Sequence, residues 1–132
     1  MKRFGLSATE RVKKRKDFKQ IFNTGSTIYS AGKLFKAVYV IERNSINPGV
    51  QIAAAVSKRS GIAFWRNRVK RLLKESFRNN KEILLETCSN KNILLKIIFS
   101  PNLLNDKNKK TIKLNDVLPN VVEIMIKLKS VL

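Results

Sequence analysis

The sequence is short of the side chains that most enzymes use for catalysis: it contains no histidine and a single cysteine, Cys88. Without histidine the commonest general base is missing. One cysteine can form neither an internal disulfide nor, alone, a zinc site or a Cys–His nucleophile pair. A lone thiol is also typical of a reducing compartment. We therefore expect a cytoplasmic protein in which Cys88 is buried or partly buried and has no catalytic role.

Acidic residues and long apolar runs are scarce as well. The nine Asp and Glu residues stand singly along the chain, so no cluster in the sequence predicts a protein site for a catalytic metal ion. No apolar run approaches the ~18 residues that a membrane span needs, and no apolar region of a signal peptide follows the basic first residues. We expect no membrane partner. If the protein takes part in a reaction, another molecule supplies the catalytic groups.

Positive charge, by contrast, is abundant: 28 Lys and Arg residues against nine acids give a formal net charge of +19. The natural partner of such a field is a polyanion. All nine arginines lie at or before Arg78, and arginine is well suited to the recognition of phosphates and bases. The predicted binding surface therefore lies in the first two-thirds of the chain. The length suits a single domain, 1–132, whose basic first part, 1–15, is expected to be extended or mobile.

Hydrophobic spacing predicts an α+β sandwich in which helices pack on a four-stranded sheet, in the order α-β-β-β-α-β-α. The predicted helices span residues 16–24, 62–86 and 115–131, and the predicted strands span 26–30, 34–41, 50–56 and 93–99. Gly25 is expected to stop the first helix as its C′ residue, and Pro119 to fall in the first turn of the last helix. Residues 89–92 are predicted to form a turn, and 102–113 a loop with little structure of its own.

The strongest functional signal is the basic run at residues 66–71, Arg-Asn-Arg-Val-Lys-Arg, within the longest predicted helix. At about 100° per residue, most of its basic side chains lie on one side of the helix. Such a run is usually a solvated face, but Glu75 is the one acid among the cations, too few for the usual i,i+4 ion pairs. Arg66 projects into the apolar arc and is expected to reach along the sheet edge. These features favour a cationic surface for a phosphate backbone.

Residues 66–78 closely resemble the signature of the bacterial ribonuclease P protein subunit. Residues 56–59 match the strand-end motif of that family, and Lys16-Asp17-Phe18, Ile21-Phe22 and Gly25 match its first helix in order and approximate spacing. The resemblance implies the α+β sandwich of the family, with a left-handed β-α-β crossover through the long helix. The general rule for such crossovers favours the right hand.

The resemblance also implies a function. In this family a large catalytic RNA subunit cleaves precursor tRNA, and the protein binds the 5′ leader and assists its endonucleolytic removal. The Mg²⁺ ions are held mainly by the RNA subunit. The partners would then be the catalytic RNA and precursor tRNA, and the protein alone would be inactive. The residues themselves leave open a ribosomal or other structural RNA-binding protein without a catalytic partner.

Carried over residue by residue, the resemblance divides the candidate site into two parts. The leader-binding cleft would contain Phe18, Phe22, Tyr39 or Phe35, Lys58 and Arg59. The part facing the catalytic RNA and the cleavage region would contain Arg66, Asn67, Arg68, Lys70, Arg71 and Lys74. Without the resemblance, the two phenylalanines of the first helix are more simply core residues, and the cations at 58–59 a solvated strand end. Trp65 is expected to be a hydrophobic anchor at the helix start, in preference to a stacking platform.

Overall fold

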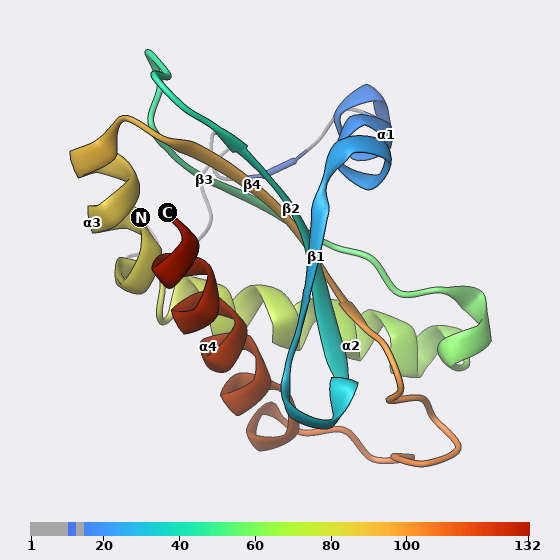
Figure 1. The fold of residues 1–132 in the computed structure, drawn as a ribbon. Coiled ribbons are helices and arrows are strands. Elements are labelled where there is room, and N and C mark those ends of the chain that lie inside the picture. Colours follow the sequence, from blue (N-terminus) through green and yellow to red (C-terminus); the bar gives the residue numbers. More distant parts are fainter. Residues whose placement is uncertain (1–10, 13–14) are drawn as a thin grey trace, which may run out of the picture.

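A four-stranded sheet organises the fold in the computed structural model, which describes residues 11–12 and 15–132 (Figure 1). Its strands are β1 (Ser26–Tyr29), β2 (Phe35–Glu42), β3 (Gly49–Ala54) and β4 (Leu94–Pro101). The helices are α1 (Arg15–Thr24), α2 (Ala63–Arg78), α3 (Glu82–Lys91) and α4 (Leu114–Val131), and two 3-10 turns are η2 (Ala31–Lys33) and η3 (Lys58–Ser60). The predicted α+β architecture is confirmed, with one more helix than expected.

The strands lie in the order β1-β2-β4-β3. Strand β2 pairs antiparallel with β1 and with β4, whereas β3 runs parallel to β4. Two parallel neighbours need a crossover connection, and α2 and α3 lie in the segment that joins β3 to β4. The left hand of this crossover stays a prediction from the family resemblance.

The main hydrophobic core lies between one face of the sheet and helices α2, α3 and α4, which Figure 1 shows together on that side. Alternate residues of β4 point into it, and Leu95, Ile97 and Phe99 are fully buried. Helix α4 adds buried residues at intervals of three and four from Val117 to Leu128. Each such side chain stabilises the fold by about 1.5–3 kcal/mol, so this core holds the three helices on one face.

The opposite face of the sheet carries a smaller hydrophobic cluster, covered by α1. Ile21 of α1 is fully buried and packs with Val38, Ala53 and Ile98 of the sheet. In Figure 1, α1 lies across the sheet from α2, α3 and α4. With only ten residues, α1 leaves Val40 partly buried, so this face is covered in part. We call it the α1 face of the sheet.

Residues 11 and 12 pair with the sheet, which agrees with the extended one of the two conformations predicted for the first segment. Arg11 forms a parallel bridge with Ile52 of β3, and the Val12 N–H donates to the Ile52 carbonyl at 2.9 Å. The Val12 side chain is 6% exposed and joins the smaller cluster. Because β3 is an edge strand, this pairing satisfies backbone groups that would otherwise be free. The other residues of the predicted segment, apart from Arg15 in α1, lie outside the described part.

The single helix predicted over 62–86 is wrong: the chain forms two helices, α2 and α3. Asn79 still donates its N–H to the Glu75 carbonyl, but the Asn80 N–H turns to Phe77, and its side chain donates to the Ser76 carbonyl at 3.0 Å. Asparagine side chains compete with the backbone in this way and end helices. The turn predicted at 89–92 is also mostly helical, because α3 continues to Lys91. Asn92, in the left-handed conformation with φ of 55°, ends this helix.

Gly25 ends α1, as the sequence predicted, but it does not adopt the left-handed conformation that is common at such positions. Its φ is not positive, and its N–H donates to the Ile21 carbonyl at 2.8 Å. A Cβ at this position would lie 2.4 Å from the Ile21 oxygen and 2.8 Å from Cγ1 of Val38. Glycine is required here because α1 and β2 approach closely at their junction.

Helix α4 begins at Leu114, which places Pro119 in its second turn and not in its first as predicted. The helix start is set by a reciprocal pair: Lys113 N–H donates to Oδ2 of Asp116 at 2.8 Å, and Asp116 N–H donates to the Lys113 carbonyl at 2.9 Å. Among the described residues, no helix has the length and apolar character needed to cross a membrane.

Candidate RNA-binding site

The aromatic residues of α1 divide into one that packs and one that faces solvent. Phe18 is partly buried and packs against the smaller cluster, whereas Phe22 is 49% exposed. Ile21 supplies the anchor that holds α1 on the sheet. The simpler interpretation, in which both phenylalanines are core residues, therefore fails for Phe22. A half-exposed aromatic ring beside a sheet is available to stack on an unpaired base.

Tyr39 and Phe35 do not join these phenylalanines, contrary to the prediction. Phe35 is 1% exposed in the main core, and Tyr39 packs against the same core. Both lie on the face of the sheet that α2, α3 and α4 cover, while Val38 and Val40 point to the α1 face. The two-residue period of a strand groups Tyr39 with Phe35 but does not say which face α1 covers. The sequence could not settle this placement.

Lys58 and Arg59 lie in η3, one turn beyond the end of β3, where the sequence predicted the strand to continue to Val56. Hydrogen bonds hold this turn: Ser60 N–H donates to the Ser57 carbonyl at 3.1 Å, and the two hydroxyl oxygens lie 3.0 Å apart. Both cationic side chains are exposed. The backbone is thus ordered while the charges reach into solvent.

Helix α2 carries the basic run as an amphipathic helix, as predicted. Asn67, Arg71 and Lys74 are exposed, and Lys70 is half-buried; we call these four residues the basic face of α2. No carboxylate among residues 11–12 and 15–132 forms an ion pair with them. The charges of Lys70, Arg71 and Lys74 are therefore open to a phosphate backbone.

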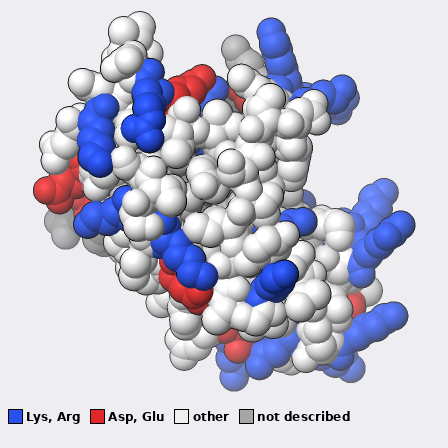
Figure 2. Space-filling model, viewed as in Figure 1, with Lys and Arg blue, Asp and Glu red and all other residues white. Residues whose placement is uncertain are grey.

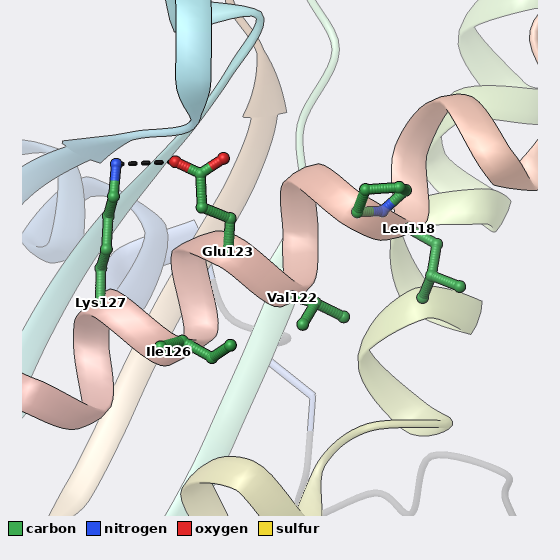
Figure 3. A pocket seen from close by; sticks show the side chains of 6 residues that line it. Leu118, Val122, Glu123, Ile126 and Lys127 are labelled. Atoms are coloured by element: carbon green, nitrogen blue, oxygen red, sulfur yellow. Dashed lines mark ion pairs between the residues drawn. The ribbon is translucent and has the colours of Figure 1, made fainter.

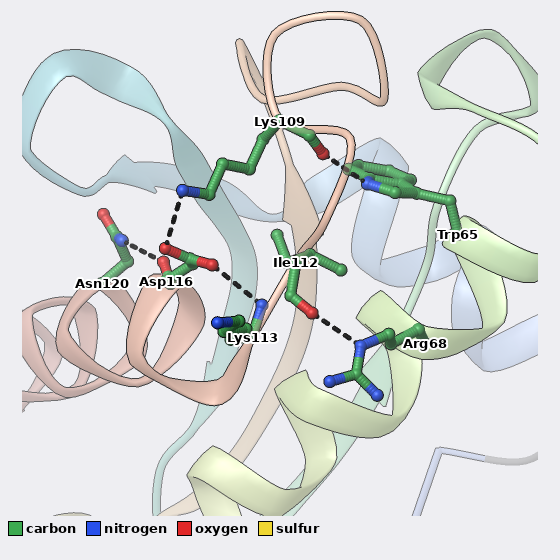
Figure 4. A network of polar contacts seen from close by, with 7 residues as sticks. All are labelled: Trp65, Arg68, Lys109, Ile112, Lys113, Asp116 and Asn120. Carbon is green, nitrogen blue, oxygen red and sulfur yellow. Dashed lines mark hydrogen bonds and ion pairs between the residues drawn. The ribbon is translucent and has the colours of Figure 1, made fainter.

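Arg66 and Arg68 use part of their guanidinium groups within the protein. Arg66 is half-buried, and its Nε donates to the Gly61 carbonyl at 3.0 Å. It therefore turns back toward the segment before the helix and not along the sheet edge. The Arg68 Nε donates to the carbonyl of Ile112 at 2.6 Å (Figure 4). Both side chains are positioned by these bonds, with their terminal nitrogens left over for further contacts.

The loop 102–113 has no helix or strand, as predicted, but it is tied to the start of α2. Trp65 is 3% exposed, and its indole N–H donates to the Lys109 carbonyl at 2.8 Å (Figure 4), which confirms the anchor interpretation. Asp106 accepts the Ile62 N–H at 3.1 Å and donates its own N–H to Ser60. Local sequence patterns do not reveal these contacts, because the contacts join segments about 44 residues apart.

The same loop is closed at its far end by Asp116. Burial raises the pKa of Asp116, but the hydrogen bond from the Lys113 N–H and the Lys109 ammonium, 3.2 Å away, outweigh it and lower the pKa below its ordinary value. The carboxylate is therefore ionised at neutral pH and links the loop to α4 (Figure 4).

Basic side chains lie on several parts of the surface, including the left of the view in Figure 2. Figure 2 shows Lys and Arg over α1 at the upper right and over the turn where α2 begins at the lower right, with uncharged surface between them. Within the described residues, no group of three or more His, Cys, Asp and Glu side chains could hold a metal ion. The described surface therefore combines an exposed aromatic ring, Phe22, on a helix that also carries exposed cations with the basic face of α2.

Comparison with known proteins identifies the family. The sequence model of the family Ribonuclease P matches residues 6–119. The chain belongs to the ribonuclease P protein family. The ribonuclease P protein component of Macrococcus caseolyticus is 36% identical over 76 residues, 58% of this chain and 63% of that protein. The component of Streptococcus thermophilus is 46% identical over 71 residues, 54% of this chain and 60% of that protein. These matches span less than two-thirds of the length of the relatives.

Solved structures of the family have the same fold. The RNase P protein of Staphylococcus aureus superposes with a TM-score of 0.65 at 24% identity, over 90% of this chain and 94% of that chain. The RNase P protein of Thermotoga maritima gives a TM-score of 0.69 at 20% identity, over 89% and 96%. At these identities the likeness establishes the fold alone.

Two further surface features of this ribonuclease P family member were not singled out from the sequence. Phe64, the second residue of α2, is 78% exposed. Its helical position, about 160° from Arg66, places it on the basic side, which the projection could have revealed. On α4, Leu118, Val122 and Ile126 line an apolar groove beside the Glu123–Lys127 ion pair, whose atoms are 2.8 Å apart (Figure 3).

Proposed function

We propose that this chain is the protein subunit of a cytoplasmic ribonuclease P, in which it binds a catalytic RNA and the 5′ leader of precursor tRNA. One observation carries the proposal: an exposed aromatic ring on α1 and an unneutralised basic helix, α2, belong to a chain of the ribonuclease P protein family. The first suits single-stranded bases, and the second suits a phosphate backbone.

The proposed leader site lies at α1 and the turn η3. Phe22 offers the exposed ring face, whereas Phe18 is half-buried and packs against the smaller cluster. Lys58 and Arg59 supply exposed cations for leader phosphates. Stacking on an aromatic side chain is worth about 1–3 kcal/mol per base and tolerates any sequence. Such a site would recognise that a leader is present with little regard to its sequence.

The proposed site for the catalytic RNA is the basic face of α2. Its side chains are exposed or half-buried, they lack acidic partners among the described residues, and they sit on a helix of 16 residues that packs firmly on the main core. Arg66 and Arg68 are held by backbone carbonyls at 3.0 and 2.6 Å, which orders their guanidinium groups before RNA arrives. Preorganised cations lose less conformational entropy on binding.

The protein would act by binding and orienting RNA. In the proposed complex Mg²⁺ is held mainly by the RNA subunit, because the described residues of this chain offer no clustered carboxylates for it. No step of cleavage is assigned to a side chain of this protein. Dense positive charge on α2 lowers the repulsion between two RNA molecules that must lie together. The competing function is a structural RNA-binding protein with no catalytic partner.

Reconstitution tests the proposal. The chain is mixed with a bacterial ribonuclease P RNA at low Mg²⁺, and a precursor tRNA is scored for release of its intact leader. We expect correct 5′ maturation with both subunits and none with the protein alone. A Lys74→Ala variant should need more protein for the same rate, whereas Lys129→Ala, an exposed lysine on α4, should behave as the unaltered chain. No stimulation of the RNA would favour the structural RNA-binding function.

One arm of this experiment addresses activity of the protein alone. A solved structure in the same family is of a Staphylococcus aureus RNase P protein mutant with defective mRNA degradation activity. The chain is therefore incubated with an mRNA and with precursor tRNA, without the RNA subunit. Accurate cleavage of precursor tRNA without the RNA subunit would contradict the proposal that the protein only binds and orients RNA.

A further inference from the structure

Phe64 is the most exposed aromatic residue in the described part of the chain: it is 78% exposed, against 49% for Phe22. It lies in the first turn of α2, on a helix whose other side packs into the main core. Isolated exposed apolar residues are common in proteins and by themselves indicate nothing. The surroundings of Phe64 are what make it informative.

Phe64 shares one side of α2 with polar and cationic residues. Asn67, Arg68 and Arg71 follow it at intervals of three, four and seven residues, which places all four on one side of the helix. We call this side the outer face of α2. Asn67 and Arg71 are exposed, and Arg71 has no ion-pair partner in the described part of the chain. An aromatic ring is thus set among unneutralised hydrogen-bond donors.

Arg68 is held in place beside the ring. Its Nε donates to the Ile112 carbonyl at 2.6 Å, and no other residue in the described ranges receives a bond from its terminal nitrogens. The side chain is therefore ordered by the loop 102–113 while its outer edge stays available (Figure 4). The nearby acids are engaged elsewhere: Glu75 pairs with Arg78 at 3.7 Å, and Asp106 accepts the Ile62 N–H.

We propose that Phe64 stacks on an unpaired base of the catalytic RNA, with Arg68 and Arg71 contacting the phosphates on either side of that base. The charge of this surface selects a polyanion, and the ring adds a flat apolar surface that a phosphate backbone alone would not use. A protein partner would need an acidic surface with an apolar centre. Nucleic acid supplies both features in each nucleotide.

The catalytic RNA is the occupant, and not the leader, because the outer face adjoins the basic face of α2 and shares Asn67 and Arg71 with it. Phe22, the stacking residue of the proposed leader site, lies on α1, across the sheet from α2. Only the cations Lys58 and Arg59 of that site lie near the start of α2, in η3. This assignment rests on the proposed function. It adds a contact with an RNA base to a surface that would otherwise contact only the phosphate backbone of the RNA.

Binding of the catalytic RNA, without precursor tRNA, tests the inference. Affinity is measured for the unaltered chain, Phe64→Ala, Phe64→Leu and Phe64→Trp, with Ile126→Ala on the outward side of α4 as the matched control. Loss of one stacked base should weaken binding roughly 5- to 150-fold in the Ala and Leu variants. Phe64→Trp should keep the affinity, because it keeps an aromatic face. Ile126→Ala should leave it unchanged.

A second readout reports stacking directly. Indole fluorescence is quenched when the ring stacks on a base, so Phe64→Trp should lose its added emission on saturation with the RNA, relative to the unaltered chain with buried Trp65. Ile126→Trp should keep its emission.

The outcomes separate this inference from the proposed function. Tight RNA binding by the unaltered chain together with equal affinity for Phe64→Ala would overturn the stacking role and leave the subunit role standing. Equal loss in Phe64→Ala and Ile126→Ala would overturn it too, because the effect would not be local. If Phe64→Leu kept the full affinity, the stacking role would be overturned, because apolar contact alone would explain the binding. If the unaltered chain failed to bind the catalytic RNA, the proposed function and this inference would both fail.

Discussion

The indole nitrogen of Trp65 lies 2.8 Å from the carbonyl oxygen of Lys109 and donates a hydrogen bond to it. This bond joins the first turn of α2 to the loop 102–113, which also accepts a hydrogen bond from Arg68. The loop thereby fixes the end of α2 at which the basic run begins. The order of the candidate site depends on a segment that carries no regular secondary structure.

Replacing Trp65 by phenylalanine tests this connection. The variant keeps most of the apolar contact but leaves the Lys109 carbonyl without its donor, so we expect a loss of about 1–2 kcal/mol in the free energy of unfolding. Urea denaturation followed by circular dichroism measures it. Lys110→Ala, an exposed position in the same loop, should change the stability by less than about 0.5 kcal/mol. Equal stabilities of the two variants would show that the bond is not important.

Alanine substitutions at Gly25 and Gly32 distinguish the effect of a steric collision on stability from the effect of backbone strain. An alanine at 25 would place its Cβ 2.4 Å from the Ile21 oxygen, and backbone must move to relieve the contact. Gly32 has a φ of +67° and open space around its Cβ, so its substitution brings strain alone. We expect Gly25→Ala to lower the stability by about 2–3 kcal/mol and Gly32→Ala by about 1 kcal/mol. A melting temperature lower for Gly32→Ala than for Gly25→Ala would reverse this ranking.

Cys88 should be unreactive in the folded protein. Its side chain is fully buried, and burial raises the pKa of the thiol to about 11. At pH 8 only about one thiol in a thousand is then the reactive thiolate. Labelling with iodoacetamide should be slow in buffer and fast in denaturant, with the denatured sample as the control for reagent quality. Rapid labelling under native conditions would mean that α3 opens readily from the core.

The ion pair on α4 should make the fold sensitive to acid. The hydrogen bond from the Lys127 ammonium, followed by that from the Ala31 N–H, lowers the pKa of Glu123 below its ordinary value. A carboxyl group with a lowered pKa in the folded state stabilises the fold above its unfolded pKa of about 4.3 and loses that contribution as the pH falls. Because the pair is partly exposed, the effect should be at most about 1 kcal/mol.

Glu123→Gln removes this contribution. The variant should be slightly less stable at neutral pH, and its stability should fall less steeply between about pH 5 and pH 3. Glu86→Gln, an exposed position on α3, serves as the control and should keep the original pH profile. Identical profiles for Glu123→Gln and the unaltered chain would show that the pair is screened by solvent.

Much of the fold could be predicted because the local signals and the packing agree. The strand at 93–99 and the last helix follow from apolar periods of two and of three to four, and the structure ends these elements within two residues of the prediction. The break between α2 and α3 was missed because hydrophobic spacing continues across it through Ile83 and Leu84. The helix is interrupted at Asn80, whose N–H donates to the Phe77 carbonyl and whose side chain donates to the Ser76 carbonyl.

The charges of the candidate site could be predicted from the sequence, but the side of the sheet on which its aromatic residues lie could not. The basic run and its lack of acidic partners can be read from residue types alone, and both are present on α2. The position of Tyr39 depends on which side of the sheet α1 covers, and that is decided by Ile21 packing on Val38. Likewise, the bond from Trp65 to Lys109 joins residues 44 apart in sequence, beyond the reach of local patterns.

The leader is the part of the substrate that the proposed site on α1 distinguishes. Affinity for precursor tRNA and for mature tRNA, measured with the catalytic RNA at low Mg²⁺, therefore tests the central claim most directly. We predict tighter binding of the precursor, and a Phe22→Ala variant that loses roughly 5- to 150-fold of that preference because a stacked base is lost. Ile126→Ala should retain the full preference. Equal affinity of the unaltered complex for precursor and mature tRNA would contradict the account.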